Sequence, residues 1–290
     1  MNKKVYDIII IGAGPAGVSA SLYAKRADKS VLMLYHGVSQ LEKAHKIDNY
    51  YGFPEGITGK ELYLNGIMQA INLGVDAKKE EVLDVRMNPD KSFAVKTADD
   101  TYTAKAVIIA TGNKKIRPNI RGVKEFEGKG VSYCAVCDGF FYRKKKVAVI
   151  GNGEYAVSEA KELENIVSDI VILTDSFPAP KTDIRVITEK ISEIKGEARV
   201  SSVVFENGEE LSVDGVFIAL GVAGGADFAK KLGVVSVKDK LRVDEKMRTN
   251  LPGVFACGDL TGNLLQVSKA VHEGAEAGLA AVEYIKNNNN

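Results

Sequence analysis

Cysteine, excess charge of either sign and long apolar runs are all scarce in this chain. Its 290 residues include three cysteines, too few for the disulfide framework of a secreted domain. The formal net charge is +1, so no overall field draws the protein to nucleic acid or to a membrane surface. No apolar run approaches the roughly 20 residues that a membrane-spanning helix needs. We therefore expect a cytoplasmic protein that binds neither nucleic acid nor membranes, long enough for two domains.

Two of the cysteines, Cys134 and Cys137, form a C-x-x-C pair, which Asp138 follows directly. In a cytosolic protein such a pair indicates a catalytic or metal-binding site more often than a structural disulfide. A closed zinc site needs four ligands, usually in two short-spaced pairs. The other candidate ligands stand alone in the sequence: Cys257, His36, His45 and His272. We predict no metal site, which leaves an inert pair of small residues or a redox-active dithiol.

An internal repeat predicts the fold. "YDIIIIGAGPAGVSASLYAKRADKSVLMLY" (residues 6–35) is an apolar run, a glycine turn, a helix-like stretch and a second apolar run, and "KVAVIGNGEYAVSEAKELENIVSDIVILTD" (residues 146–175) repeats the plan. Continuous Val/Ile/Leu runs are typical of buried parallel strands. Each copy therefore predicts a β-α-β unit of a nucleotide-binding fold.

The glycines of the first copy have separate expected roles. Gly12 turns the chain tightly, Gly14 lets the backbone approach a pyrophosphate, and Gly17 lets the helix pack close to the strand. The start of the helix then offers N–H groups and partial positive charge to the phosphates. In the second copy, Gly151, Gly153 and Ala156 occupy the same positions, with the alanine that the fingerprint allows.

Two further stretches fit a bound flavin. "AVIIATG" (residues 106–112) is a buried strand that ends in a small-residue turn, and "GVFACGDLTGN" (residues 253–263) is a short strand that ends in Gly-Asp. Asp259 there either accepts a ribityl hydroxyl or caps a helix. The small-residue helix expected after it can pack closely against a cofactor. We therefore expect one bound flavin and one visiting nicotinamide dinucleotide.

These motifs resemble the low-molecular-weight thioredoxin reductases over nearly the whole chain. The resemblance rests on "IIGAGPAGVSASLYA", "IIATG", "GVSYCAVCDGFFYRKKKVAVIGNG" and "GVFACGDLTG", in the order and spacing of that family. It implies FAD, a homodimer, and a three-layer α/β fold of two Rossmann-like domains. Residues 1–113 and 244–290 would form a discontinuous FAD domain. Residues 114–243 would form an inserted NAD(P)H-binding-like domain that carries the dithiol.

The resemblance also implies roles for individual residues. Cys137 would face the flavin, Cys134 would attack the disulfide of a thioredoxin or thioredoxin-like protein, and Asp138 would protonate a departing thiolate. FAD would be lined by Gly12, Gly14, Ala16, Gly17, Gln40, Asn49, Thr111, Gly112, Gly258, Asp259, Gln266 and Val267. The chemistry of the C-x-x-C pair independently supports a role in disulfide exchange. Such an environment lowers the pKa of a cysteine, and disulfide exchange needs a thiolate.

The second nucleotide site departs from the family. Members that use NADPH carry a basic cluster at the end of the second strand, where this chain has Thr174, Asp175, Ser176 and Pro180. Three interpretations stay open. In the first, NADH binds and Asp175 accepts a hydrogen bond from its ribose 2′-OH. In the second, the second nucleotide-binding fold is a relic and reduced ferredoxin supplies the electrons, as it does in a branch of the family. In the third, NADPH binds through other residues. The nicotinamide site, if present, would comprise Gly151, Gly153, Ala156 and Asp175.

Other classes of protein fit less well. Ferredoxin–NADP reductases of similar fold lack the C-x-x-C pair, and the reductases of peroxidase systems usually carry an additional N-terminal redox domain. A flavin-binding module without catalysis would not need Cys134 and Cys137. The basic run of residues 143–146 is interpreted as a solvated turn or as a surface that steers an acidic partner such as thioredoxin or ferredoxin.

Overall fold

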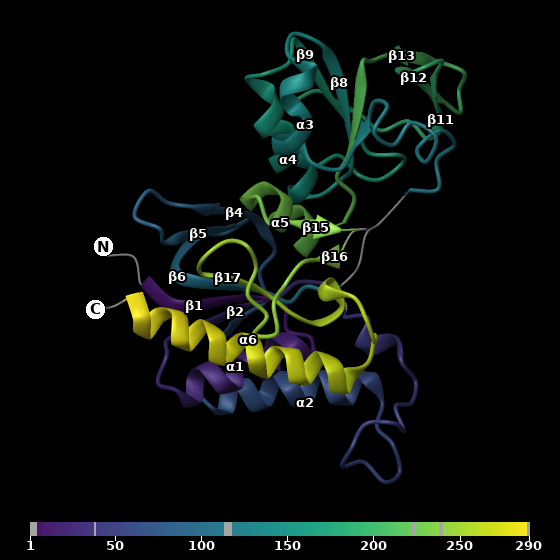
Figure 1. The fold of residues 1–290 in the computed structure, drawn as a ribbon. Helices are drawn as coiled ribbons and strands as arrows, with labels where there is room; N and C mark the ends of the chain where they lie inside the picture. The colour runs from purple at the N-terminus through teal and green to yellow at the C-terminus, as the bar shows by residue number, and fades with distance from the viewer. Residues whose placement is uncertain (1–4, 38, 113–117, 222–223, 238–239, 289–290) are drawn as a thin grey trace. The chain divides into compact units, whose positions relative to one another are not determined.

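The structure, a computed structural model, describes residues 5–37, 39–112, 118–221, 224–237 and 240–288 (Figure 1). The chain divides into two compact units. The first takes both ends of the chain, residues 1–114 and 224–290, and the second takes residues 115–223. Each unit is built on a sheet with a parallel core. The predicted α/β class with two Rossmann-like domains is confirmed.

The first unit contains a seven-stranded sheet in the order β3-β2-β1-β6-β5-β4, with β17 also paired to β6. The first part of β6 pairs antiparallel with β5, and its last part pairs parallel with β17. The carboxyl ends of β1, β6 and β17 therefore meet at one edge of the parallel sheet. The strands are β1 (Val5–Ile11), β2 (Val31–Leu34), β3 (Asp76–Lys78), β4 (Val82–Met87), β5 (Phe93–Thr97), β6 (Thr101–Ile109) and β17 (Val254–Ala256).

Two helices of the first unit, α1 (Pro15–Arg26) and α6 (Val267–Asn288), lie side by side along this sheet (Figure 1, α6 in yellow). Glycines make this approach possible, since a Cβ on Gly274 would lie 2.1 Å from the carbonyl oxygen of Ala16. A Cβ on Gly278 would meet the oxygen of Ala20 in the same way. The other elements of this unit are η1 (Leu41–Lys43), α2 (Gly59–Asn72), α5 (Gly225–Leu232), β15 (Ser236–Val237), β16 (Lys240–Leu241) and η3 (Gly258–Thr261).

The second unit has a five-stranded parallel sheet in the order β10-β9-β8-β14-β7 and a smaller antiparallel sheet, β11-β12-β13. The large sheet comprises β7 (Val131–Ser132), β8 (Lys146–Ile150), β9 (Asp169–Leu173), β10 (Val186–Ile187) and β14 (Gly215–Ile218). The small sheet comprises β11 (Ile191–Gly196), β12 (Val200–Phe205) and β13 (Glu210–Ser212). The helical segments are α3 (Ala135–Asp138), η2 (Gly139–Tyr142) and α4 (Glu154–Glu164).

The second boundary between the units differs from the expected position. The sequence places it at 243/244, whereas the compact units divide at 223/224. Helix α5 packs against β4, where Lys231 and Asp84 form a buried ion pair with Nζ and Oδ1 3.7 Å apart. In addition, the Gly225 N–H donates to Thr111 Oγ1 at 2.8 Å. These contacts join residues 224–243 to the first unit. The expected first boundary, 113/114, lies outside the described residues.

Within the described residues, none of the helices is both long enough and apolar enough to cross a membrane.

Candidate active site

The two cysteines of the C-x-x-C pair are joined by a disulfide bond in the second unit. Cys134 is the N-cap of α3, and the Cys137 N–H donates to Cys134 Sγ at 3.2 Å. Cys134 is 3% exposed, whereas Cys137 is exposed. An N–H group aimed at a sulfur stabilises its thiolate, so this bond would favour a thiolate on Cys134 after reduction.

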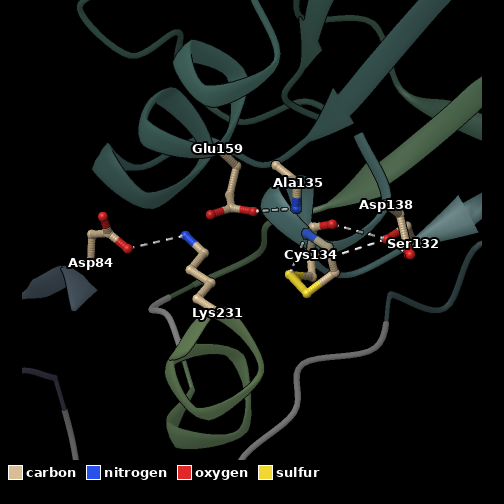
Figure 2. The surroundings of a disulfide bond; sticks show 8 residues. Asp84, Ser132, Cys134, Ala135, Asp138, Glu159 and Lys231 are labelled. Atoms are coloured by element: carbon tan, nitrogen blue, oxygen red, sulfur yellow. Dashed lines mark hydrogen bonds and ion pairs between the residues drawn. A yellow bond between two sulfur atoms is a disulfide. The ribbon is translucent and has the colours of Figure 1, made fainter. Parts of the chain in front are cut away.

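A serine that the sequence analysis missed links the dithiol to its acid. Ser132 Oγ donates to Asp138 Oδ2 at 2.6 Å and accepts from the Cys134 N–H at 3.1 Å (Figure 2). Asp138 is therefore held beside the cysteine pair through one hydroxyl. The sequence contained a signal for this contact, because a serine two residues before a C-x-x-C motif can turn its side chain back to hydrogen-bond the backbone.

A buried carboxylate lies on the other side of the pair. Glu159, from α4, accepts a hydrogen bond from the Ala135 N–H through Oε2 at 2.8 Å (Figure 2). Nothing in the local sequence predicts this contact, because it depends on α3 packing against α4.

In the first unit, the glycine turn has the geometry that a phosphate group requires. Gly12 has φ +112°, and a Cβ on Gly17 would lie 1.9 Å from the Gly12 carbonyl oxygen. Around Gly14, in contrast, a Cβ would meet nothing within 4 Å. Gly14 is the N-cap of α1, which has neither a side-chain cap nor an acidic residue in its first turn. The residues present thus fit the pyrophosphate of a dinucleotide.

Several other predicted flavin residues gather at the carboxyl ends of the same strands. A Cβ on Gly12 would lie 3.0 Å from the Thr111 nitrogen, and one on Gly258 would lie 3.0 Å from Ala16 Cβ. Gly112 follows Thr111 with φ +73°. Asp259 lies within η3, and the long helix expected after it, α6, begins only at Val267, so Asp259 does not cap that helix.

Two further predicted flavin residues are joined by a hydrogen bond. Asn49 Nδ2 donates to Gln266 Oε1 at 2.9 Å, although 217 residues separate the two in sequence. Val267 follows as the first residue of α6. Gln40 precedes η1 and is exposed, and among the described residues no hydrogen bond joins it to the other predicted flavin residues.

An ion pair that the sequence analysis did not predict holds the Gly258–Asp259 turn. Lys269 Nζ and Glu273 Oε2 lie 2.9 Å apart, with side chains 12% and 9% exposed. Lys269 also donates to the Gly258 carbonyl at 2.7 Å, and Glu273 accepts from the Gly258 N–H at 2.9 Å. Thr261 Oγ1 bonds to both side chains. The signal was a Lys and a Glu at i, i+4 in a helix whose other buried residues are small or apolar.

We expect Lys269→Met to destabilise the protein by about 3 kcal/mol, because it leaves the Glu273 carboxylate buried without its cation. Denaturant unfolding of the FAD-bound protein measures this effect. The matched control is Lys246→Met, which removes the exposed pair with Glu283 and should cost less than about 1 kcal/mol. Equal losses in the two variants would show that the Lys269 pair contributes no more than a surface contact.

The second glycine turn, in the second unit, has a different environment. A Cβ on Gly151 would lie 2.2 Å from the Ala219 carbonyl oxygen and 2.8 Å from Ala156 Cβ, so packing within the unit already requires this glycine. Gly153 is the N-cap of α4, and Glu154 occupies the first turn of that helix. A carboxylate there interacts favourably with the helix dipole and repels a pyrophosphate.

The carboxylate of Asp175 is engaged by its own chain. Its Oδ1 accepts from the Ile191 N–H at 2.9 Å, and its Oδ2 lies 3.3 Å from Lys190 Nζ. Both Asp175 and the following Ser176 have positive φ. For Asp175 to accept a ribose hydroxyl as predicted, its bond with Ile191 would have to be shared or released.

The third cysteine, Cys257, is fully buried between β17 and η3. Burial raises the pKa of its thiol, so the group stays protonated and unreactive. Cys257 is therefore a small core residue and takes no part in disulfide exchange.

Comparison with known proteins defines the class. Residues 6–274 match the family described as "Pyridine nucleotide-disulphide oxidoreductase". The thioredoxin reductase of Listeria innocua is 36% identical over 98% of this chain and 95% of the relative. The chain belongs to this family and, within it, to the thioredoxin reductases. Family membership implies FAD as the cofactor.

Two solved structures resemble the whole chain. The crystal structure of the atypical thioredoxin reductase of Desulfovibrio vulgaris Hildenborough has a TM-score of 0.91 and 40% identity, and covers 97% of this chain and 98% of its own. The ferredoxin-flavin thioredoxin reductase of Clostridium acetobutylicum has a TM-score of 0.72 and 33% identity, with 98% and 99% covered.

Proposed function

We propose that this protein is a thioredoxin-disulfide reductase that passes electrons through FAD and the Cys134–Cys137 disulfide to a thioredoxin or thioredoxin-like protein. The observation that carries this proposal is the disulfide itself, at the start of α3, with Asp138 held beside it by Ser132. A structural disulfide would need neither the acid nor the N–H directed at Cys134. Family membership supports the same conclusion.

The residues around the disulfide suit the two halves of the exchange. Gly12, Gly14 and the start of α1 would hold FAD, which would supply the two electrons that reduction of the disulfide requires. The Cys137 N–H then stabilises a Cys134 thiolate, which attacks the partner's disulfide to form a mixed disulfide. Cys137 in turn attacks Cys134 Sγ, which re-forms the internal bond and releases the partner with two thiols. Asp138, linked through Ser132, is placed to protonate the departing thiolate.

The surface next to the dithiol suits a protein partner. Phe140 and Phe141 are each 69% exposed, and Val136, between the two cysteines, is also exposed. Single exposed apolar residues are common, but three in one six-residue stretch beside the disulfide offer apolar surface that a partner could cover. Arg143 lies over the Phe140 ring at 5.8 Å and begins the exposed basic run, which adds attraction for an acidic partner.

For the electron donor, we propose reduced ferredoxin. Three features of the second unit disfavour a pyridine nucleotide: no basic side chain at the aligned loop positions, Glu154 at the start of α4, and the engaged carboxylate of Asp175. A 2′-phosphate carries nearly two negative charges and needs charge-assisted partners. NADH is the second candidate, because it lacks this phosphate.

We expect ferredoxin alone to reduce the bound flavin rapidly. The test is anaerobic mixing of the oxidised protein with reduced ferredoxin, NADH or NADPH, each in turn, while flavin absorbance is followed. Rapid bleaching by micromolar NADPH would contradict the proposal. Bleaching by NADH alone would assign the ribose role to Asp175, and Asp175→Arg should then shift preference toward NADPH.

The homodimer and the cytoplasmic location stay predictions. One feature supports the dimer: Leu64, Met68 and Ile71 form an exposed apolar stripe at helical spacing on α2, a face that a second copy would cover.

A further inference from the structure

Glu159 is a buried acid that the exchange described above does not use. It lies in α4, is 2% exposed, and holds the Ala135 N–H at 2.8 Å. Ala135 is the first residue of α3, directly after Cys134. Burying a carboxylate is costly unless hydrogen bonds and charges compensate it. The position of Glu159 against the first N–H of α3 therefore suggests that this carboxyl group has a role there.

We propose that Glu159 is a positioning residue that sets the reduction potential of the Cys134–Cys137 disulfide. Its oxygen fixes the backbone at the point where the chain leaves Cys134, and its carboxyl group lies beside the segment whose Cys137 N–H would stabilise a Cys134 thiolate. The inference rests on the proposed redox role of this disulfide. It concerns the equilibrium of the dithiol and adds no step to the exchange.

The direction of the effect follows from charge. Reduction adds two electrons to the disulfide and produces two thiols, one of which loses its proton to become the Cys134 thiolate. A negative charge on Glu159, next to the residue that follows Cys134, disfavours that thiolate. Glu159 therefore destabilises the reduced form, which lowers the potential and makes the dithiol a stronger reductant. Disulfide oxidoreductases become more oxidising when their reduced form is stabilised.

Glu159→Gln separates charge from position, because the amide oxygen can still accept from the Ala135 N–H. We expect this variant to shift the equilibrium toward the dithiol about tenfold, which corresponds to about 30 mV for a two-electron couple. Glu159→Leu removes the acceptor as well and tests whether the bond anchors α3. Glu164→Gln is the matched control, since Glu164 lies in the same helix and is exposed. It should leave the equilibrium within twofold of the native value.

The experiment uses the complete FAD-bound protein, equilibrated anaerobically with mixtures of reduced and oxidised dithiothreitol. In this exchange, dithiothreitol closes its ring disulfide as Cys134 and Cys137 become thiols. Acid quenching, alkylation under denaturing conditions and mass measurement count the free thiols, with Cys257 as a constant third. This readout requires neither thioredoxin nor turnover.

A Glu159→Gln variant with an unchanged potential would overturn the inference and leave Glu159 as a helix anchor. A shift in the opposite direction would overturn it as well. The proposed function fails separately, in the native protein, if the Cys134–Cys137 disulfide cannot be reversibly reduced.

Discussion

Gly14→Glu is expected to yield a folded protein that has lost its flavin. A Cβ at Gly14 meets nothing within 4 Å, so a substitution there should leave the packing of β1 against α1 unchanged. Its carboxylate, however, would enter the space in front of the α1 N-terminus that we assign to the pyrophosphate. Lost helix contacts and repulsion between like charges should weaken FAD binding at least roughly 1000-fold, about 4 kcal/mol. The measurement is the ratio of flavin absorbance to protein after purification, followed by titration with FAD.

Two alanine variants define what this result means. Gly14→Ala should fold and keep most of its flavin, because the added methyl group faces open space. Gly17→Ala should destabilise the protein itself, since the new Cβ would lie 1.9 Å from the Gly12 carbonyl oxygen. Full flavin occupancy in the folded Gly14→Glu variant would show that the first glycine motif is a structural turn and binds no phosphate.

Serine at either cysteine of the disulfide is expected to abolish thioredoxin reduction. Without both sulfurs, electrons cannot be stored in a dithiol or released by closing the disulfide. We expect kcat/KM to fall on the order of 1000-fold or more, at least about 4 kcal/mol of transition-state stabilisation. Cys257→Ala is the control and should retain activity, because Cys257 is buried and protonated. Normal turnover by Cys134→Ser or Cys137→Ser would remove the disulfide from the mechanism.

The same variants identify the attacking sulfur. A thioredoxin whose one remaining active-site cysteine carries a thionitrobenzoate group can be captured by a free thiolate, which displaces the coloured leaving group. We expect Cys137→Ser to form this stable mixed disulfide rapidly and Cys134→Ser to form it slowly. Because Cys134 is 3% exposed in the disulfide state, its attack requires local opening after reduction. Faster capture by Cys134→Ser would reverse the two roles.

Local patterns predicted the repeating architecture well. The two segments at residues 6–35 and 146–175 form strand, helix and strand as expected: β1, α1 and β2 in the first, and β8, α4 and β9 in the second. Such patterns are informative because a buried parallel strand needs a continuous apolar run and a tight strand-to-helix turn needs glycine. Residues 143–145 of the basic run form an exposed turn before β8, as predicted, and Lys146 is the exposed first residue of that strand.

Sequence spacing was less informative about the site at which a nicotinamide nucleotide would deliver electrons. Asp175 lies at the end of β9, as the pattern predicts, but its carboxylate is held by the Ile191 N–H. That bond depends on where β11 begins, and the side-chain chemistry of Asp175 does not reveal it. Glu154 was visible in the sequence, but its significance depends on its place in the first turn of α4.

The sequence by itself determined the α/β class, the two glycine turns and the C-x-x-C pair, because each depends on residues within a short stretch of chain. Only the tertiary structure joined residues 224–243 to the first unit, through Lys231 with Asp84 and Gly225 with Thr111. It also placed the Glu159 carboxylate against the dithiol helix. Such contacts join side chains and backbone groups far apart in sequence, and they arise only when packed helices and strands remove those groups from water, where an unpaired polar group is costly.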